Sequence, residues 1–536
     1  MIIFRNIIQK PNSMRPWYYL ILASCLLHNI ISLANSTPQQ NPQQAISSEA
    51  INLQQQLDHM KQQIAALEDR QQALLKTENL AQPSQPNYSV VENATFPAEK
   101  TPVFEATNEQ AEDVTYGYPL LANLGGTAVI TSPFIHARYD FRGSGLLINY
   151  SSIDKDVAAL SQRRDFYNQM RAAGLVLPRY PILELSGRIE GEFRQYRLWN
   201  GREGNAIDLS GAELDMQALV NDWFLGFMSF AYDNSPTDSG NRINNSSLYL
   251  DNGFITLGNL NKIPYYATIG QIYVPFGQFS SYLISDPLNK IIFRTKARAL
   301  SIGYQSLQGQ GFYGALFGFQ GPTREGYKTA TLTVPDSSYY INTFGGNIGY
   351  AYTVGPLSGL IGGSIINNVA DSLGMQSTDG PYFGGFATSA ATEVLAHPVP
   401  GYDLRAEMNY EPFVLIAEYT AATRGFSPLD LTFNGQGAKP AGYHLEAIYK
   451  FDMFQRPSNL ALGYGRSFEA LALNVPQYRG AIALNTAIWK NTLLSLEYRQ
   501  DVNYAQDDTA SGSNGGVFSP VGKNQNVVTA HFDIYF

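Results

Sequence analysis

The sequence predicts an all-β protein: a 16-stranded antiparallel transmembrane β-barrel, preceded by a short N-terminal periplasmic coiled-coil helix. Three observations favour this fold. The stretch 526–536 alternates apolar and mostly polar side chains with the period of a β-strand. Charged residues make up only 15% of the chain, whereas aromatic residues make up 12%, a balance that lipid-facing alternating strands produce. Short and long connections alternate between the strands expected from residue 182 onward.

The N-terminal stretch 1–34 reads as a signal peptide. Basic residues precede an apolar run, and small residues before Asn35 suit cleavage after Ala34. Two alternatives stay open. Cleavage before Cys25, the sole cysteine, would leave a lipidated N-terminus, and an uncleaved apolar run would act as a short membrane anchor. The apolar residues that continue after Cys25 favour cleavage after Ala34.

A heptad pattern predicts a coiled coil over 45–77. Apolar residues are spaced alternately by three and four, with polar residues between them. A lone helix cannot bury such a seam, so we expect self-association, preferably as a homotrimer; the alternative is a solvated or partly disordered Gln-rich helix. The stretch 78–120 follows as a Pro-rich tether. The core residues of the coiled coil are Leu53, Leu57, Met60, Ile64, Leu67 and Leu74.

The segment 121–181 does not follow the strand rhythm. It is rich in turn residues at first, and then a helix is expected from Ile153 toward Ala173. Asp154 and Asp156 fall in its first turn, where negative charge suits the helix dipole. The segment is expected either to plug the barrel lumen or to cap its periplasmic mouth, and the sequence leaves both open.

The barrel domain is predicted over 182–536. In one expected strand, Leu404 and Ala406 on one face alternate with Arg405 and Glu407 on the other. Aromatic residues near the expected strand ends, among them Tyr266 and Tyr273, suit interfacial girdles. The sixteen strands are expected at 182–198, 207–220, 223–233, 248–258, 265–275, 298–306, 311–320, 343–353, 358–366, 402–411, 413–423, 442–451, 458–469, 479–490, 492–504 and 526–536.

The connections set the topology. Tight turns at 221–222, 308–310, 355–356, 412 and 491 are read as periplasmic turns. An even number of strands returns both ends of the barrel to the periplasm. The longer connections are read as external loops: 234–247, 276–297, 321–342, 367–401, 424–441 and 505–525.

No motif points to an enzyme. The chain has no nucleophile elbow, zinc-ligand spacing, phosphate-binding loop or dinucleotide fingerprint, and its six histidines are scattered. We therefore expect no catalytic residue, no metal site and no cofactor. The net charge of −9 argues against nucleic acid as a partner.

Two sets of residues are the sequence's functional candidates. The apolar face of the last strand, Phe532, Ile534 and Phe536, resembles the sorting signal that the barrel-insertion machinery of the bacterial outer membrane recognises. The charges expected in the lumen lean acidic, which favours cations or a bulky solute held by many polar contacts; the alternative is ordinary solvated charge in cross-strand pairs. The candidate binding residues in the lumen are Arg188, Glu190, Arg194, Asp403, Arg405, Glu407 and Arg499.

The order of these features resembles a known family. A signal, a short coiled coil, a tether, the motif at 126–134 (Gly-Thr-Ala-Val-Ile-Thr-Ser-Pro-Phe), a helix with Asp154 and Asp156, and Leu-Glu-Leu-Ser-Gly at 183–187 are similar to the LbtU siderophore porins of Legionella and related bacteria. The Francisella proteins FslE and FupA are a more distant likeness. The resemblance implies uptake of ferric siderophore, and it assigns no individual ligand residue.

The expected protein is therefore a barrel in the outer membrane of a Gram-negative bacterium. It would be exported through the inner membrane, be surrounded by outer-membrane lipid, and take up ferric siderophore or another small solute. Two alternatives remain: a general or substrate-selective diffusion porin without a role in iron, and a structural or adhesive surface protein that binds through 367–401.

Overall fold

The computed structural model describes residues 120–124, 127–132, 134–135, 152–172, 181–233, 247–329, 332–335, 340–377, 383–389, 392–489, 491–513 and 516–536. The predicted signal peptide, the coiled coil with its core from Leu53 to Leu74, and the tether up to residue 119 lie outside these residues. Those assignments stay predictions. Among the described residues, no helix is both long enough and apolar enough to cross a membrane.

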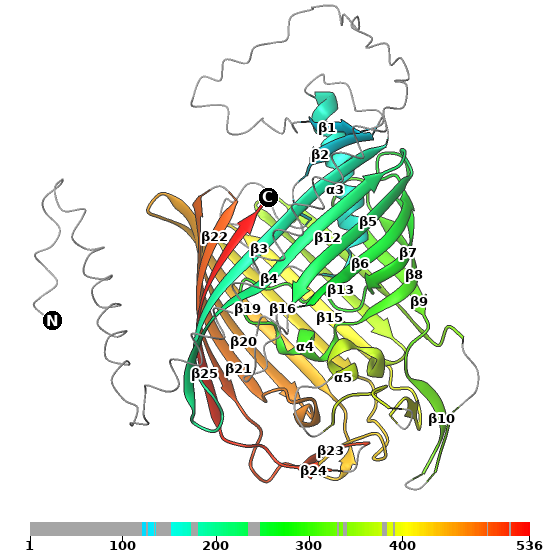
Figure 1. Ribbon diagram of the computed structural model, residues 1–536, viewed down its shortest axis with the longest axis vertical. Coiled ribbons are helices and arrows are strands. Elements are labelled where there is room, and N and C mark those ends of the chain that lie inside the picture. Colours follow the sequence, from blue (N-terminus) through cyan, green and yellow to red (C-terminus); the bar gives the residue numbers. More distant parts are fainter. Residues whose placement is uncertain are drawn as a thin grey trace, which may run out of the picture. The chain divides into compact units, whose positions relative to one another are not determined.

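A closed antiparallel barrel forms the body of the molecule (Figure 1). Among the described residues, sixteen strands each pair with the next along the chain, and the last pairs with the first, so the predicted 16-stranded barrel is confirmed. The strands are β3 (Ile182–Arg197), β4 (Glu203–Leu219), β5 (Phe224–Asp233), β6 (Ser247–Gly258), β7 (Tyr265–Tyr273), β8 (Lys296–Gln305), β9 (Gly311–Phe319), β12 (Thr343–Val354), β13 (Leu357–Ile366), β15 (Gly401–Tyr410), β16 (Phe413–Ala422), β19 (Ala441–Met453), β20 (Arg456–Phe468), β21 (Tyr478–Trp489), β22 (Thr492–Val502) and β25 (Asn524–Tyr535).

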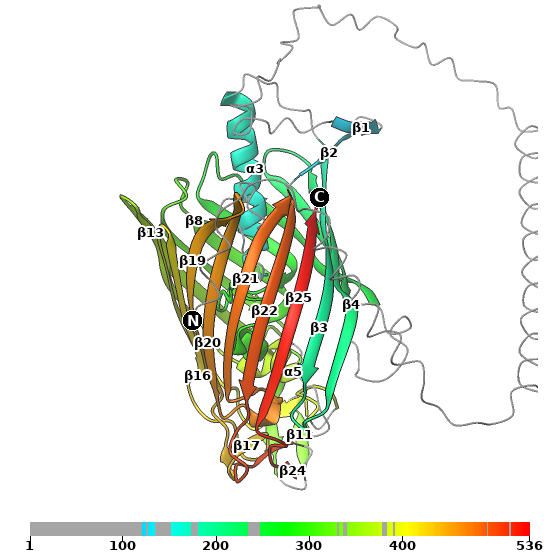
Figure 2. The ribbon, with the colours of Figure 1, turned by 90° about the vertical axis from the view of Figure 1, so that its left-hand side faces the viewer.

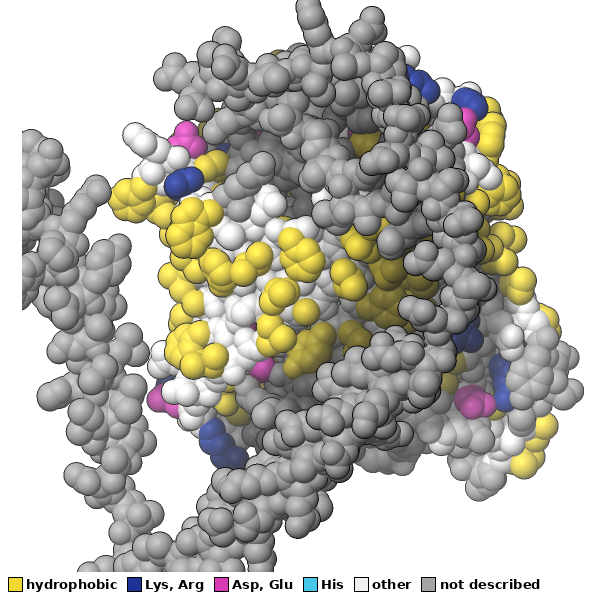
Figure 3. Space-filling view, turned by 45° about the horizontal axis from the view of Figure 1, so that its top comes forward, with side chains coloured by type: hydrophobic (Ala, Val, Ile, Leu, Met, Phe, Trp, Pro, Cys, Tyr) yellow, Lys and Arg dark blue, Asp and Glu magenta, His cyan; other side chains and the backbone are white. Residues whose placement is uncertain are grey.

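Side chains alternate between the two faces of the barrel wall. In β25, Val528 and Ile534 are exposed on the outside, whereas His531, Asp533 and Tyr535 are buried. Hydrophobic side chains cover the middle of the visible barrel face, and most charged groups there lie toward its borders (Figure 3). This apolar exterior around a polar interior is the arrangement that an outer-membrane barrel requires.

Some aromatic residues face the other way from the predicted girdles. Tyr265 is exposed on the outside, but its neighbour Tyr266 is buried, and so are Tyr273 and Tyr535. Because side chains alternate along a strand, two consecutive tyrosines cannot both face lipid. The buried three therefore belong to the lumen rather than to an interfacial belt.

The long connections carry structure that the sequence pattern did not predict. In their described part, β10 (Arg324–Lys328), β11 (Thr333–Pro335) and β14 (Val394–Leu395) form a three-stranded sheet. A four-stranded sheet joins β17 (Leu431–Phe433), β18 (Gln436–Gly437), β23 (Ala510–Gly512) and β24 (Val517–Phe518). These strands have two to five residues, too few for a period of two to stand out. The short helices are η3 (Val369–Asp371), α5 (Leu373–Gln376) and η4 (Leu471–Leu473).

A small hairpin and a helix precede the barrel. β1 (Leu120–Leu124) pairs with β2 (Thr127–Thr131), and β2 pairs in parallel with the first residues of β3. The helix α3 (Lys155–Ala172) begins two residues later than expected, and the carbonyl of Asp154 accepts from the amide of Ala158. Figure 2 shows the far end of α3 rising above the rim of the barrel, at the end where the C-terminus lies.

One long connection folds inward. Residues 274–295, here called the inward loop, join β7 to β8 and contain α4 (Leu288–Phe293). The sequence counts 276–297 among the external loops; it did not predict that the loop folds into the lumen, where glutamates of the wall bind its backbone. The loop carries Phe276, Phe279 and Leu288, all buried, and such an apolar segment is stable only when it is covered.

Candidate functional site: the barrel lumen

The first turn of α3, the barrel wall and the inward loop surround a cavity of about 370 Å³. It is lined by charges of both signs. The cations are Lys155 of α3, Arg188 of β3, Lys290 and Arg294 of the inward loop, with His531 of β25 nearby on the wall. The carboxylates are Glu190, Glu192, Glu213, Asp251 and Asp286.

Glu213 of β4 anchors the first turn of α3. Its Oε1 lies 2.5 Å from Nζ of Lys155 and accepts a hydrogen bond from the hydroxyl of Ser229, and its Oε2 accepts from Nε of Arg188 at 3.2 Å. Burial disfavours the charge on Lys155, but the surrounding carboxylates, Glu213 foremost, more than offset this and raise the pKa of the ammonium. Lys155 therefore stays charged and holds α3 against the wall.

Further contacts of α3 reach β6 and β7. The hydroxyl of Thr268 donates to Asp156 at 2.6 Å, and Arg163 donates to the carbonyl of Gly258 at 2.5 Å. Leu160 is fully buried on the same side of the helix. Burial raises the pKa of Asp154 to about 6, against the opposing field of Arg405, and it raises the pKa of Asp156 as well.

Three glutamates of the wall hold the backbone of the inward loop. Glu418 of β16 accepts from the amides of Gln278 and Phe279 at 2.6 and 2.9 Å. Glu446 of β19 accepts from the amide of Tyr282 and from the hydroxyl of Ser281, both at 2.8 Å. Hydrogen bonds to a charged acceptor are the stronger kind.

Glu497 of β22 makes the third attachment. It accepts from the amides of Ile284 and Ser285 at 2.6 and 3.1 Å. Further along the loop, Lys290 donates to Asp286 at 2.7 Å; burial lowers the pKa of Lys290, partly offset by Asp286. The loop is thus fixed along the inside of the wall from β16 to β22.

The structure separates most of the lumen residues that the sequence singled out. Arg188 and Glu190 line the cavity. The other five occupy different places. Arg194 forms ion pairs with Glu192 and Asp208 on the wall, and Arg499 forms an ion pair with Asp501 at 3.2 Å.

The remaining three belong to β15. Arg405 donates to the carbonyl of Gly277 and to the hydroxyl of Tyr313, both at 2.8 Å, so it supports the inward loop. Asp403 is buried and accepts from Thr420 at 2.8 Å. Glu407 is half-buried on the same face. None of these three lines the cavity.

The apolar residues of the proposed sorting signal lie on the outside of β25. Ile534 and Phe536 are exposed, and Phe532 is half-buried on the same face. The backbone of Phe536 makes two hydrogen bonds with that of Gly187, at 2.8 and 3.0 Å. These residues therefore stand where lipid or an assembly factor can reach them.

Several residues that line the cavity were not predicted from the sequence. Lys155 was counted only as part of a helix, and Asp286, Lys290 and Arg294 lie in a connection that was taken as external. A signal was present, because 276–293 is far more apolar than a solvated loop needs to be. His531 lies on the mostly polar face of the alternation at 526–536, but the pattern alone did not identify its partners.

In sequence, the chain is similar to proteins that carry the name UPF0422. No family model matches the chain. The chain is 36% identical over 408 residues to a UPF0422 protein of Coxiella burnetii, covering 75% of this chain and 83% of that protein. It is 37% identical over 424 residues to the UPF0422 protein lpl2888 of Legionella pneumophila strain Lens, covering 77% of each.

Solved structures give a likeness of fold only. An anion-selective porin from Comamonas acidovorans aligns with a TM-score of 0.43 at 15% identity, over 67% of this chain and all of that one. The outer-membrane channel DcaP of Acinetobacter baumannii aligns with a TM-score of 0.42 at 15% identity, over 66% and 97% of the two chains.

Proposed function

The chain belongs to the UPF0422 family, and from that premise and the arrangement of its lumen we propose that it is a plugged outer-membrane channel for uptake of ferric siderophore. The segment before β3 is the plug, held by the first turn of α3. The inward loop forms the opposite side of the cavity. Solute enters from outside, rests in the cavity, and passes when α3 moves.

The attachment of α3 inside the barrel carries this proposal. An unobstructed diffusion pore has no need of a buried Lys155–Glu213 pair in its lumen. Breaking one partner of such a pair is costly, because the other charge is left buried. The plug is thus expected to be closed at rest and to open when a bound solute supplies the compensating contacts.

The cavity suits a small polar ligand. Its volume of about 370 Å³ lies within the usual range for small-molecule sites, about 300–1,000 Å³. Arg188 and Arg294 offer several donors to an anionic chelate, and Tyr249 and Tyr273 offer aromatic faces. The resemblance to siderophore porins supplies the identity of that chelate, and the geometry is compatible with it.

Uptake of radioiron-labelled native siderophore by iron-starved cells tests the substrate. Parent, gene-deletion and complemented strains are compared. We expect the deletion to lose uptake and the gene to restore it. Unchanged uptake in a strain without paralogues would remove the iron role, and a diffusion porin would then be the better description.

Single-channel conductance of the purified barrel tests the plug separately. The wild-type protein is expected to pass little current, and a protein lacking 121–181 to pass large steady currents. Wild-type currents as large as those of the deletion would contradict a plug, whatever the substrate.

A further inference from the structure

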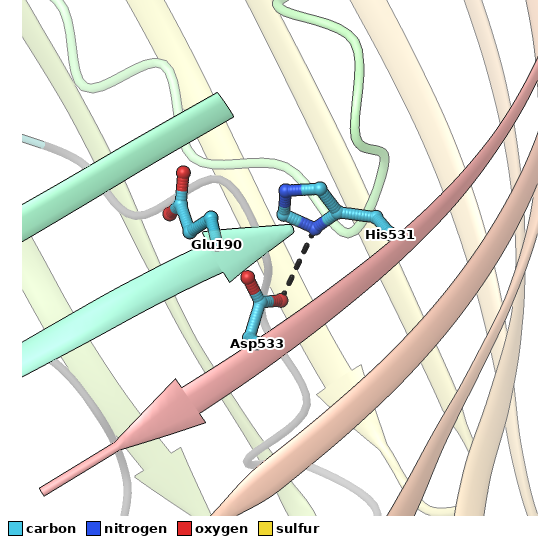
Figure 4. Close-up of side chains that lie close together, drawn as sticks. All are labelled: Glu190, His531 and Asp533. Carbon is cyan, nitrogen blue, oxygen red and sulfur yellow. Dashed lines mark ion pairs between the residues drawn. The ribbon is translucent and has the colours of Figure 1, made fainter. Parts of the chain in front are cut away.

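Glu190, His531 and Asp533 lie together in the lumen at the seam where the barrel closes. His531 and Asp533 come from β25 and Glu190 from β3, beside it (Figure 4). One ligand atom of each lies within 4.8 Å of the others. We propose that these three side chains bind a divalent transition-metal ion of the kind that accepts mixed nitrogen and oxygen ligands, such as Zn²⁺ or Fe²⁺.

Asp533 gives the first independent support. Its side chain is 1% exposed, yet neither carboxylate oxygen accepts a hydrogen bond from any described residue. A buried carboxylate without donors is costly. Its ion-pair partner is Nδ1 of His531, 3.2 Å from Oδ2, but the two atoms make no aligned hydrogen bond, and Oδ1 has no hydrogen-bond partner among the described residues.

The strand register gives the second support. Asp533 stands directly opposite Glu190 in the β3–β25 pair, and like charges in opposite positions destabilise a sheet. Arg188 forms an ion pair with Glu190, but it is shared with Glu213. A cation between Glu190 and Asp533 removes the repulsion that Arg188 offsets only in part.

The surroundings of His531 select its metal-binding nitrogen. Nε2 lies 3.2 Å from the hydroxyl of Ser210. Metal-binding histidines commonly donate their second ring nitrogen to such a partner, which fixes the tautomer. Nδ1 is then left with its lone pair toward Asp533. Ser210 reaches this position because the β3–β4 register shifts between Glu190 and Gly191, placing an extra residue on β4.

The distance between His531 and Asp533 fits the proposed ion, and the carboxylate of Glu190, whose ligand atom lies within 4.8 Å of theirs, would move toward them to complete the site. Two ligands of a tetrahedral zinc ion, each about 2.1 Å from it, lie roughly 3.4 Å apart, close to the 3.2 Å between Nδ1 and Oδ2. Glu190 has room beside Gly211, where a Cβ atom would come within 2.5 Å of its Oε2. His531 and Glu190 both line the cavity, so an ion can arrive from the lumen.

A second His–carboxylate pair on the barrel wall serves as a control for the proposed metal site. His444 and Glu446 on β19 repeat the spacing of His531 and Asp533, with Nε2 of His444 2.8 Å from Oε2 of Glu446. There, however, Ser281 and Tyr282 occupy the carboxylate oxygens. His444 is therefore the matched histidine that should not bind metal.

The test is a Co²⁺ titration of the purified full-length protein in detergent, followed by visible absorption and by competition with Zn²⁺. We expect saturable binding of one ion to wild type and to His444→Ala. Binding should weaken at least tenfold in His531→Ala and in the nearly isosteric Asp533→Asn and Glu190→Gln. Heat-modifiable migration on gels verifies that each variant is folded.

The opposite results overturn the site. If wild-type protein shows no saturable Co²⁺ binding, or if Asp533→Asn binds Co²⁺ as tightly as wild type, then His531 and Asp533 form only an ion pair and no metal site. The inference does not depend on siderophore transport. If the protein binds Co²⁺ but a deletion strain takes up siderophore normally, the metal site stands and the proposed transport function fails. If uptake depends on the gene but the protein binds no Co²⁺, the transport function stands and the metal site fails.

Discussion

At the scale of single residues, Glu213 joins the barrel wall to α3, the proposed plug. It accepts from Lys155, Arg188 and Ser229. Replacing Glu213 by Gln leaves the ammonium of Lys155 buried without its main counter-charge, which costs about 3–5 kcal/mol for a buried pair. We expect α3 to leave the lumen more often and single-channel openings to become frequent.

Glu203→Gln is the control for Glu213→Gln on the same strand. Glu203 is exposed, and its ion pair with Arg197 spans 3.9 Å at the far end of β4, so its loss should change little. Equal conductance in Glu213→Gln and wild type would show that this contact does not hold the plug.

Asp154 predicts a pH dependence. Burial raises its pKa to about 6 in the docked state, against its usual 3.8 when released. Between those values the docked plug binds more protons, so anchoring weakens as the pH rises. From pH 5 to 7.5 the loss is about 1 kcal/mol, and channel openings should increase. Asp154→Asn should make the pH dependence shallower, with Asp156, whose pKa burial also raises, supplying the remainder. Exposed Asp165→Asn should leave it unchanged.

The sequence could predict which face of a strand a residue lies on, but it could not predict which residues of other strands it contacts. Alternation alone puts His531 and Asp533 on the same, mostly polar face of the last strand, because strand geometry is local. Glu190 lies beside them only because the last strand pairs with the first. In sequence, Glu190 and His531 are separated by nearly the whole barrel, so no local pattern brings them together. The register shift that brings Ser210 to His531 has no signature in a period-two pattern.

At the scale of elements, the inward loop and α3 together fill lumen space that an open barrel would leave empty. Glu446→Ala removes the acceptor of Ser281 and Tyr282. Losing hydrogen bonds to a charged group costs about 1.5–3 kcal/mol each. We expect the loop to move from the wall, with noisier currents and greater protease sensitivity within 278–286.

Glu325→Ala is the comparison for Glu446→Ala. Glu325 lies exposed on β10 in the external sheet, so its removal should alter neither the currents nor the cleavage. Identical behaviour of the two variants would mean that Glu446 does not restrain the loop.

The long barrel strands were predictable because each carries many repeats of the same alternation. The β10–β11–β14 and β17–β18–β23–β24 sheets were not, because their strands are too short for any period. The inward loop was missed for another reason: connection length indicates the side of the membrane, but it cannot show that a loop folds back into the lumen.

At the scale of the whole molecule, closure depends on β25 reaching β3. The ring of Phe536 covers Gly187, where a Cβ atom would come within 2.6 Å of it. If the apolar face of β25 is the sorting signal, Phe536→Ala should reduce folded barrel in the outer membrane severalfold. Val528→Ala, on the same face further from Gly187, should have little effect. Heat-modifiable protein in outer-membrane fractions measures both, and equal amounts would count against the signal.

The predicted coiled coil makes a separate claim about assembly. Replacing Leu57 and Ile64 with Lys places charges in the expected seam, which should convert a trimer to monomers without loss of the barrel. Cross-linking and light scattering in detergent report the change. If wild-type protein is a monomer in these measurements, the predicted trimer is wrong.

The hairpin before the barrel has a consequence for assembly. β2 occupies the edge of β3 along Ile182–Leu185, and β25 occupies the same edge from Gly187 onward. The two segments follow one another along this edge, so we expect β2 to limit how far β25 can shift toward the start of β3. A shift of β25 by one residue toward β2 would turn its outward apolar side chains inward. We expect β2 to oppose that shift, because it already pairs with Ile182–Leu185. We therefore expect the hairpin to help set the register in which β25 pairs with β3.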